Sequence, residues 1–165
     1  MKKLLISIII LFQAAWCLAQ GQTAFPFKGG KDAMEQFFKD SLTVSPAIIK
    51  KGAIGTAVFK FTASENGSIS KIIVYYADDA ILAYPVIDAL RKSDRKWAIP
   101  KDEKTHDFII PFIFSADLPA TDNEYLQKIL YDNYRGRNPI IPNDQVPLDI
   151  ATLLPPITVK YDITK

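Results

Sequence analysis

Histidine and cysteine are almost missing from this sequence of 165 residues, which contains one of each, His106 and Cys17. A metal site with two histidine ligands is therefore excluded. Cys17 belongs to an apolar leader, so a chain cleaved after that leader has no cysteine nucleophile and no disulfide. Export into an oxidising compartment adds no covalent crosslink, and packing alone has to stabilise the fold.

The chain that follows the leader also has no formal net charge. Residues 1–19 contain two lysines and no acidic residue, and their removal leaves as many basic residues as the 18 acidic ones. Proteins that bind nucleic acids or anionic membranes through bulk charge carry an excess of positive charge. We therefore expect neither of these partners.

Motifs of the common catalytic sites are missing as well. The sequence has no Gly-x-Ser-x-Gly elbow, and Gly29-Gly30-Lys31 has neither the spacing nor the preceding strand of a phosphate-binding loop. His106 falls in the polar stretch Lys104-Thr105-His106-Asp107, where we expect a solvated loop histidine. We expect no enzyme, no cofactor, no metal ion and no small-molecule substrate. A hydrolase would have to recruit His106.

The N-terminus has the composition of a secretory signal peptide. Lys2 and Lys3 precede an apolar run over residues 4–12, and Cys17-Leu18-Ala19 ends the segment with a small residue. The stretch of residues 4–19 is shorter than the roughly 20 residues of a membrane-spanning helix. We predict cleavage after residue 19 and a location in the periplasm or outside the cell. An uncleaved membrane anchor and a lipid on Cys17 are the alternatives.

Residues 20–115 have the pattern of an α+β domain. Apolar side chains with helical spacing predict helices over residues 30–42 and 84–95. Alternating or continuous apolar runs predict strands over residues 56–62, 68–76 and 107–115. Asn66-Gly67 lies between the first two strands and favours the positive φ angles of a tight hairpin turn. The predicted architecture has two helices on one face of a small antiparallel sheet of about three strands.

Two prolines interrupt these patterns. Ser45-Pro46 follows the first helix and stops or restarts the chain. Pro111 lies within the third strand and cannot donate a hydrogen bond to a neighbouring strand. The strand over residues 107–115 is therefore predicted at an edge of the sheet, or with Pro111 turned outward at a bulge.

Residues 116–165 are rich in proline but still have regular patterns. Capping-box spacing between Thr121 and Glu124, followed by an apolar stripe, predicts a helix over residues 122–134. Residues 157–164 alternate between apolar and polar side chains, as a half-buried strand does. Because a bare strand edge invites aggregation, we expect this strand to cover a free edge of its own sheet or to pair with another chain.

Several motifs, in their order along residues 25–115, make this stretch similar to the C-terminal domain of TonB, in particular its Bacteroidetes-type versions. They are Phe25-Pro26 with Gly29-Gly30, Ser45-Pro46-Ala47, Gly52-Ala53-Ile54-Gly55, Asn66-Gly67-Ser68-Ile69, Ala89-Leu90-Arg91, Trp97 with Pro100, and Ile110-Pro111-Phe112-Ile113-Phe114. The chain departs from TonB in having only ten residues between Ala19 and Gly30, where TonB has a long Pro-rich spacer. It therefore resembles a stand-alone secreted version of the domain.

The resemblance to TonB implies a function in binding other proteins. Domains of this family bind extended segments of outer-membrane receptors, which add as a strand beside the last strand of the sheet. The corresponding edge in this chain is the backbone of Phe108, Ile109, Ile110, Pro111, Phe112, Ile113 and Phe114. The resemblance therefore implies a peptide-binding envelope protein linked to TonB-dependent transport. A structural envelope protein that forms a homodimer by strand pairing is the alternative.

Overall fold

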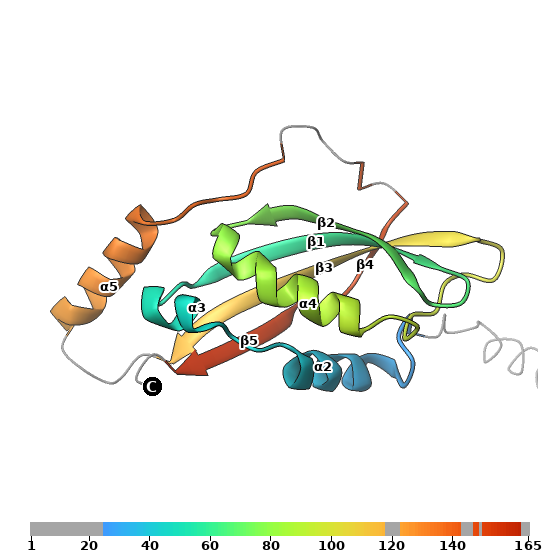
Figure 1. The fold of residues 1–165 in the computed structure, drawn as a ribbon, viewed down its shortest axis with the longest axis horizontal. Helices are drawn as coiled ribbons and strands as arrows, with labels where there is room; N and C mark the ends of the chain where they lie inside the picture. The colour runs from blue at the N-terminus through green and yellow to red at the C-terminus, as the bar shows by residue number, and fades with distance from the viewer. Residues whose placement is uncertain (1–24, 118–122, 143–146, 149, 163–165) are drawn as a thin grey trace, which may run out of the picture.

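The structure of the chain is a computed structural model that describes residues 25–117, 123–142, 147–148 and 150–162 (Figure 1). The predicted signal peptide, residues 1–19 with Cys17, lies outside these residues. None of the helices in the described ranges is long and apolar enough to cross a lipid bilayer.

The chain folds as an α+β unit around a five-stranded mixed sheet, which confirms the predicted fold class. Its helices are α2 (Gly30–Ser41), α3 (Pro46–Lys51), α4 (Ala83–Lys92) and α5 (Asn123–Arg135). Its strands are β1 (Gly55–Ser64), β2 (Ile69–Ala77), β3 (Thr105–Asp117), β4 (Thr152–Leu153) and β5 (Ile157–Asp162). The antiparallel part β2-β1-β3 corresponds to the predicted three-stranded sheet, and β4 and β5 add to the other side of β3 in parallel.

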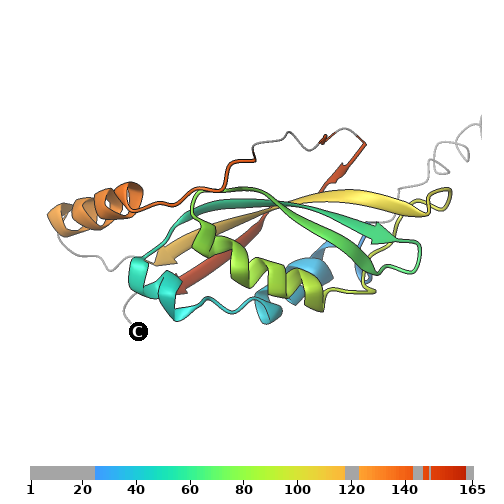
Figure 2. The same ribbon diagram turned by 45° about the horizontal axis from the view of Figure 1, so that its top comes forward.

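The helices α2 and α4 cover the same face of the sheet, as the two views in Figures 1 and 2 show. Ser45-Pro46 starts the short helix α3, because the Ser45 hydroxyl accepts a hydrogen bond from the Ile48 N–H at 3.3 Å. The buried side chains of α2 and α4 fit the predicted stripes and include Met34, Phe38, Val86, Ala89 and Leu90. Between helices and sheet, aromatic rings fill the core, among them Phe59, Phe61, Trp97, Phe108 and Phe112.

The predicted hairpin between β1 and β2 is confirmed at Asn66-Gly67. Gly67 has a φ of +81°, and Asn66 Oδ1 accepts a hydrogen bond from the Ser68 N–H at 2.9 Å. A Cβ at Gly67 would lie 2.5 Å from the carbonyl oxygen of Trp97. Glycine is therefore required both by the backbone conformation of the turn and by the close approach of the segment after α4.

The position of Pro111 differs from the prediction. β3 is an interior strand that pairs with β1 without a register shift, so Pro111 lies neither on an edge strand nor at a bulge. On the other side of β3, the Ile109 carbonyl accepts a hydrogen bond from the Leu154 N–H at 2.8 Å. Because residues two apart in a strand point their backbone groups the same way, the missing N–H of Pro111 faces the break between β4 and β5. Pro155 and Pro156 lie in that break, so no ladder hydrogen bond is lost.

The C-terminal extension contains the predicted helix as α5 and the predicted strand as β5. β5 pairs with residues 112–117 of β3, so it covers an edge of its own sheet, the first of the two predicted alternatives. Ile157 and Tyr161 are 2% and 7% exposed, while Thr158 and Lys160 are exposed to solvent. This is the predicted half-buried alternation, of which residues 163 and 164 lie outside the described part.

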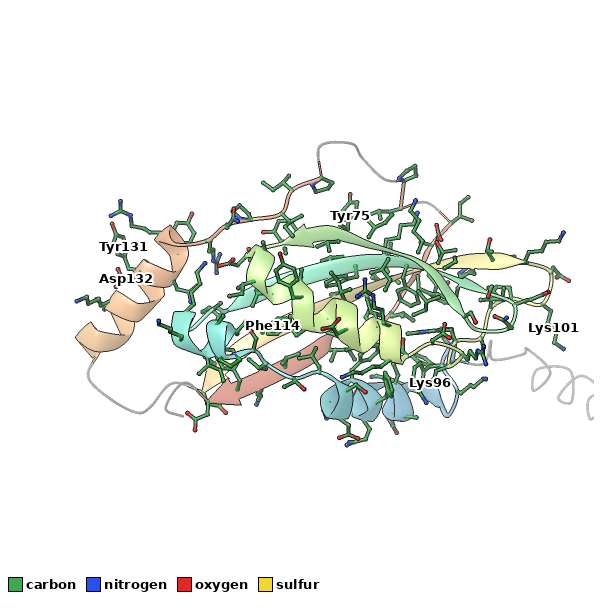
Figure 3. All side chains as sticks on the ribbon, viewed as in Figure 1. Tyr75, Lys96, Lys101, Phe114, Tyr131 and Asp132 are labelled. Carbon is green, nitrogen blue, oxygen red and sulfur yellow. The ribbon has the colours of Figure 1, made fainter. Side chains whose placement is uncertain are left out.

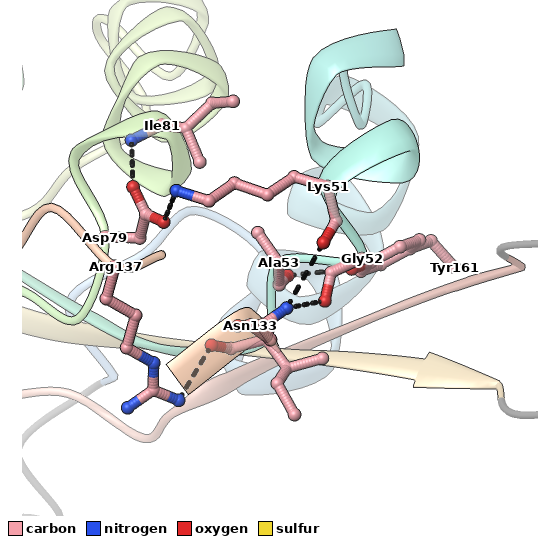
Figure 4. A network of polar contacts seen from close by, with 9 residues as sticks. Lys51, Gly52, Ala53, Asp79, Ile81, Asn133, Arg137 and Tyr161 are labelled. Atoms are coloured by element: carbon pink, nitrogen blue, oxygen red, sulfur yellow. Dashed lines mark hydrogen bonds and ion pairs between the residues drawn. The ribbon is translucent and has the colours of Figure 1, made fainter. Parts of the chain in front are cut away.

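The extension is also joined to the turn that follows α3 (Figure 4). The carbonyl oxygens of residues 51–54 accept hydrogen bonds from the side chains of Asn133, Arg137 and Tyr161. One of these hydrogen bonds comes from Tyr161, whose hydroxyl donates to the Ala53 carbonyl at 2.7 Å. Lys51 ends α3 and Gly52 is its C-cap, so their carbonyl groups have no partner within the helix, and residues 53 and 54 lie in the turn beyond it. The extension supplies these partners and thereby packs as part of the domain.

Candidate functional site

The β3 edge at which the sequence predicts partner binding is covered by the chain's own C-terminal strands. β4 pairs with Phe108 and Ile109, and β5 pairs with β3 from Phe112 onward. The aromatic and aliphatic side chains on the inner face of this stretch lie in the core, as expected: Phe108, Ile110, Phe112 and Phe114. A partner therefore meets β4 or β5 on this side of the sheet, and reaches the backbone of β3 only by displacing them.

The long outer strands of the sheet are β2 on one side and β5 on the other. At β2, the backbone of Ala77 exchanges two hydrogen bonds with Ile140, and the Ile69 N–H donates to the Asp94 carboxylate at 2.9 Å. Both ends of the β2 edge are therefore engaged. On the outer side of β5, no strand from the described ranges is paired. The outer side of β5 can therefore accept another strand, as can the middle of the β2 edge between the engaged residues Ile69 and Ala77.

A groove with a volume of about 510 Å³ lies beside β5. One wall consists of four consecutive residues of β5: Ile157, Thr158, Val159 and Lys160. The other wall comes from α2 and the segment after it: Phe38, Lys39, Leu42 and Val44. Figure 1 shows β5 at the lower border of the sheet with α2 next to it. An extended segment laid along β5 would place alternate side chains in this groove.

The groove is lined mostly by apolar side chains and also by two lysines. Lys39 and Lys160 are among its lining residues, and none of the described lining residues has a carboxylate. Within the described part of the chain, no group of three or more histidine, cysteine or acidic side chains could hold a metal ion. The groove therefore offers backbone hydrogen bonds, apolar contacts and positive charge to a bound segment.

Among the described residues, the side chains with shifted pKa values lie outside this groove. Burial alone would raise the pKa of Asp78, but hydrogen bonds from the Tyr76 hydroxyl and the Thr56 N–H, with the charge of Arg137, hold it below its ordinary value. Burial raises the pKa of Tyr161, on the inner side of β5, to about 12. These groups join parts of the fold to one another and do not mark the groove as a site of proton transfer.

Comparison with protein-family models, with curated proteins and with solved structures finds no match to this chain. The similarity to the TonB C-terminal domain therefore rests on the motifs of residues 25–115, and any function taken from it is a proposal.

The histidine lies elsewhere than the sequence predicts. His106 is the second residue of β3 and is only 8% exposed, so it is not a solvated loop residue. Its Nδ1 lies 2.6 Å from Glu103 Oε2, and its Nε2 lies 2.7 Å from Thr152 Oγ1. Thr152 is 46 positions away in the sequence and belongs to β4, a strand of two residues. Sequence reasoning missed this contact because so short a strand has no alternation that would reveal it.

Proposed function

We propose that this protein is a protein-binding module of the cell envelope that receives an extended segment of a partner as an additional strand along the outer side of β5. The observation that carries this proposal is the groove beside a strand that has no neighbouring strand on its outer side among the described residues. Strand addition takes its affinity from backbone hydrogen bonds and its selectivity from pockets for alternate side chains. β5 and the groove together offer both.

We favour a partner strand that pairs with the outer side of β5 over a partner strand that replaces β5 on β3. A partner that replaced β5 on β3 would have to uncover Ile157 and Tyr161, which are almost fully buried. The burial of each such side chain contributes about 1.5–3 kcal/mol. The hydrogen bond from Tyr161 to Ala53 contributes about 1 kcal/mol more. Exchange therefore costs on the order of 5 kcal/mol before any gain, whereas addition to β5 leaves these contacts intact.

The resemblance of residues 25–115 to the TonB C-terminal domain supports a partner from the cell envelope. In that family the bound segments belong to outer-membrane receptors, and the predicted signal peptide agrees with export to the same compartment. The proposed partners are therefore extended segments of outer-membrane receptors or of other envelope proteins, with a role in TonB-dependent transport. Lys39 and Lys160 favour segments that contain acidic residues.

Photo-crosslinking from the groove in the native envelope tests this function. A photoreactive phenylalanine analogue is placed at Thr158, an exposed groove residue of β5. The matched control has the same analogue at Ser70, an exposed residue of β2 on the opposite side of the sheet. Captured segments are identified by mass spectrometry. We expect position 158 to capture one contiguous segment of an outer-membrane receptor or another envelope protein, and position 70 to capture none.

The other outcomes of this experiment are equally defined. A crosslink from position 158 to β5 of a second copy identifies a homodimer joined edge to edge, which is the structural alternative. Equal capture at both positions, or capture at neither, contradicts the proposal, provided that both variants keep the thermal unfolding midpoint of the wild type.

A further inference from the structure

A second cleft lies where β4 meets the N-terminal half of β3. Its volume is about 660 Å³, and its apolar lining includes Phe25, Ile99, Phe108, Leu153 and Leu154. His106, Thr152 and Lys101 also line it, and Figure 3 shows Lys101 at the end of the molecule beyond the sheet. The cleft is therefore a mostly apolar space with an imidazole and a hydroxyl group in its wall.

The imidazole and the hydroxyl belong to a chain of three side chains. Glu103 Oε2 lies 2.6 Å from His106 Nδ1, and Thr152 Oγ1 lies 2.7 Å from His106 Nε2. Because a carboxylate can only accept a hydrogen bond, Nδ1 donates to Glu103, and Nε2 of the neutral ring accepts from the Thr152 hydroxyl. A hydroxyl, a base in contact with it and a third group that orients the base form the arrangement that activates nucleophiles in hydrolases.

The fold holds the histidine and the threonine in place. The His106 ring packs edge-on against Phe108, with ring centroids 4.8 Å apart. Thr152 lies opposite Phe108 in the pairing of β4 with β3. Two residues before it, Ile150 has a φ of +72°, a backbone conformation that β-branched residues rarely adopt. Strained residues of this kind cluster at functional sites.

We propose that Thr152 is a nucleophile and that this cleft hydrolyses carboxylic esters with an apolar acyl group. The Thr152 oxygen attacks the ester carbonyl carbon while His106 Nε2 takes the hydroxyl proton. The bond from that carbon to the alcohol oxygen then breaks, and His106 returns the proton to the leaving alkoxide. Water, deprotonated by the same nitrogen, hydrolyses the acyl-threonine ester and restores the hydroxyl group. Glu103 acts through His106 and is a positioning residue.

The choice of an apolar ester follows from the walls of the cleft. Phe108, Leu153 and Leu154 line the same cleft as the Thr152 hydroxyl group, and their apolar surface fits an uncharged acyl chain. This activity is separate from strand addition at β5, because the two sites share no lining residue. Either proposal can therefore fail while the other holds.

Hydrolysis of 4-nitrophenyl butyrate by the purified protein tests the proposal, together with labelling by a fluorophosphonate, which reacts with activated hydroxyl groups and releases fluoride. We expect Thr152→Val and His106→Ala to hydrolyse the ester at least about 100-fold more slowly than the wild type and to lose the label. Thr152→Ser keeps a hydroxyl group and retains both activities. Glu103→Gln lowers kcat while KM stays nearly unchanged.

Thr62→Val is the matched control. It also removes a strand hydroxyl bonded to a neighbouring side chain, since Thr62 Oγ1 donates to Asp107 Oδ1 at 2.6 Å, but Thr62 does not line the cleft. We expect the rate and the label of the wild type. Equal ester hydrolysis by folded wild type and Thr152→Val, or a wild type that takes up no label on Thr152, overturns the proposal. The three side chains then serve only to join β4 to β3.

Discussion

Replacing Ile157 with alanine tests whether β5 is a fixed part of the sheet. Ile157 is the first residue of β5, lies opposite Phe112 of β3 in the register and is 2% exposed. It belongs to the same buried cluster as Phe38 and Leu154. The substitution leaves the backbone of β5 able to pair with β3 and removes most of the side chain through which this strand meets the core.

We expect the free energy of unfolding to fall by about 2–3 kcal/mol. The substitution removes roughly three methylene-sized groups, and each contributes about 0.8 kcal/mol when buried. The cavity left behind adds to this loss, and comparable core substitutions cost about 2–5 kcal/mol. Ile157 also borders the groove beside β5, where water can enter the vacated space. This access places the expected loss at the lower end of the range.

Urea unfolding followed by the fluorescence of the buried Trp97 measures the change. Thr158→Ala is the matched control, because Thr158 is the next residue of β5 and its side chain is exposed. We expect the control to differ from the wild type by no more than about 0.5 kcal/mol. A loss below about 1 kcal/mol for Ile157→Ala, or the same loss in both variants, would refute the packing of β5 against the core.

Three further substitutions test other contacts of the fold. Gly67→Ala places a Cβ 2.5 Å from the Trp97 carbonyl oxygen at a φ of +81°, and we expect urea unfolding to show a loss of about 2 kcal/mol or more. Tyr161→Phe removes the hydrogen bond to the Ala53 carbonyl and should cost about 1–2 kcal/mol at neutral pH. Because burial raises the pKa of Tyr161 from 10.0 to about 12, its contribution is complete below pH 10 and is lost as the pH rises toward 12. The thermal unfolding midpoint of the wild type should therefore fall more steeply in this window than that of Tyr161→Phe. The pKa of Asp78 is lowered, so its contribution is present above about pH 4 and lost as the pH falls through the folded-state value. Asp78→Asn should flatten the acid decline of the midpoint, and an unchanged decline would contradict this role.

The elements that depend on short-range pattern can be predicted from the sequence. Asn66-Gly67 predicts the hairpin because glycine tolerates the positive φ that the turn has at residue 67. The spacing of Met34 and Phe38 predicts α2, and the alternation of residues 157–164 predicts β5. In each case the pattern lies within a single helix, strand or turn. Residues that are close together in the sequence are therefore enough to predict the element.

The pairing of these elements depends on contacts that no local pattern contains. The prediction of an edge strand from Pro111 assumes that an interior strand has a partner opposite each of its residues. Opposite Pro111, the break between β4 and β5 leaves no strand that would need its N–H as a donor. The free edge likewise moves from β3 to β5, because the C-terminal strand pairs in parallel with the strand that the sequence leaves uncovered. The candidate site therefore lies one strand away from its predicted position.

By itself, the amino-acid sequence determined the fold class, the hairpin, the helices α2, α4 and α5 and the existence of a C-terminal strand, because these follow from periodicity and turn chemistry. Only the tertiary structure decided which edge stays open, and it alone brought Glu103 and His106 to Thr152, which is 46 positions beyond His106. The physical reason is that strand register and side-chain contacts at such separation depend on how the whole core packs.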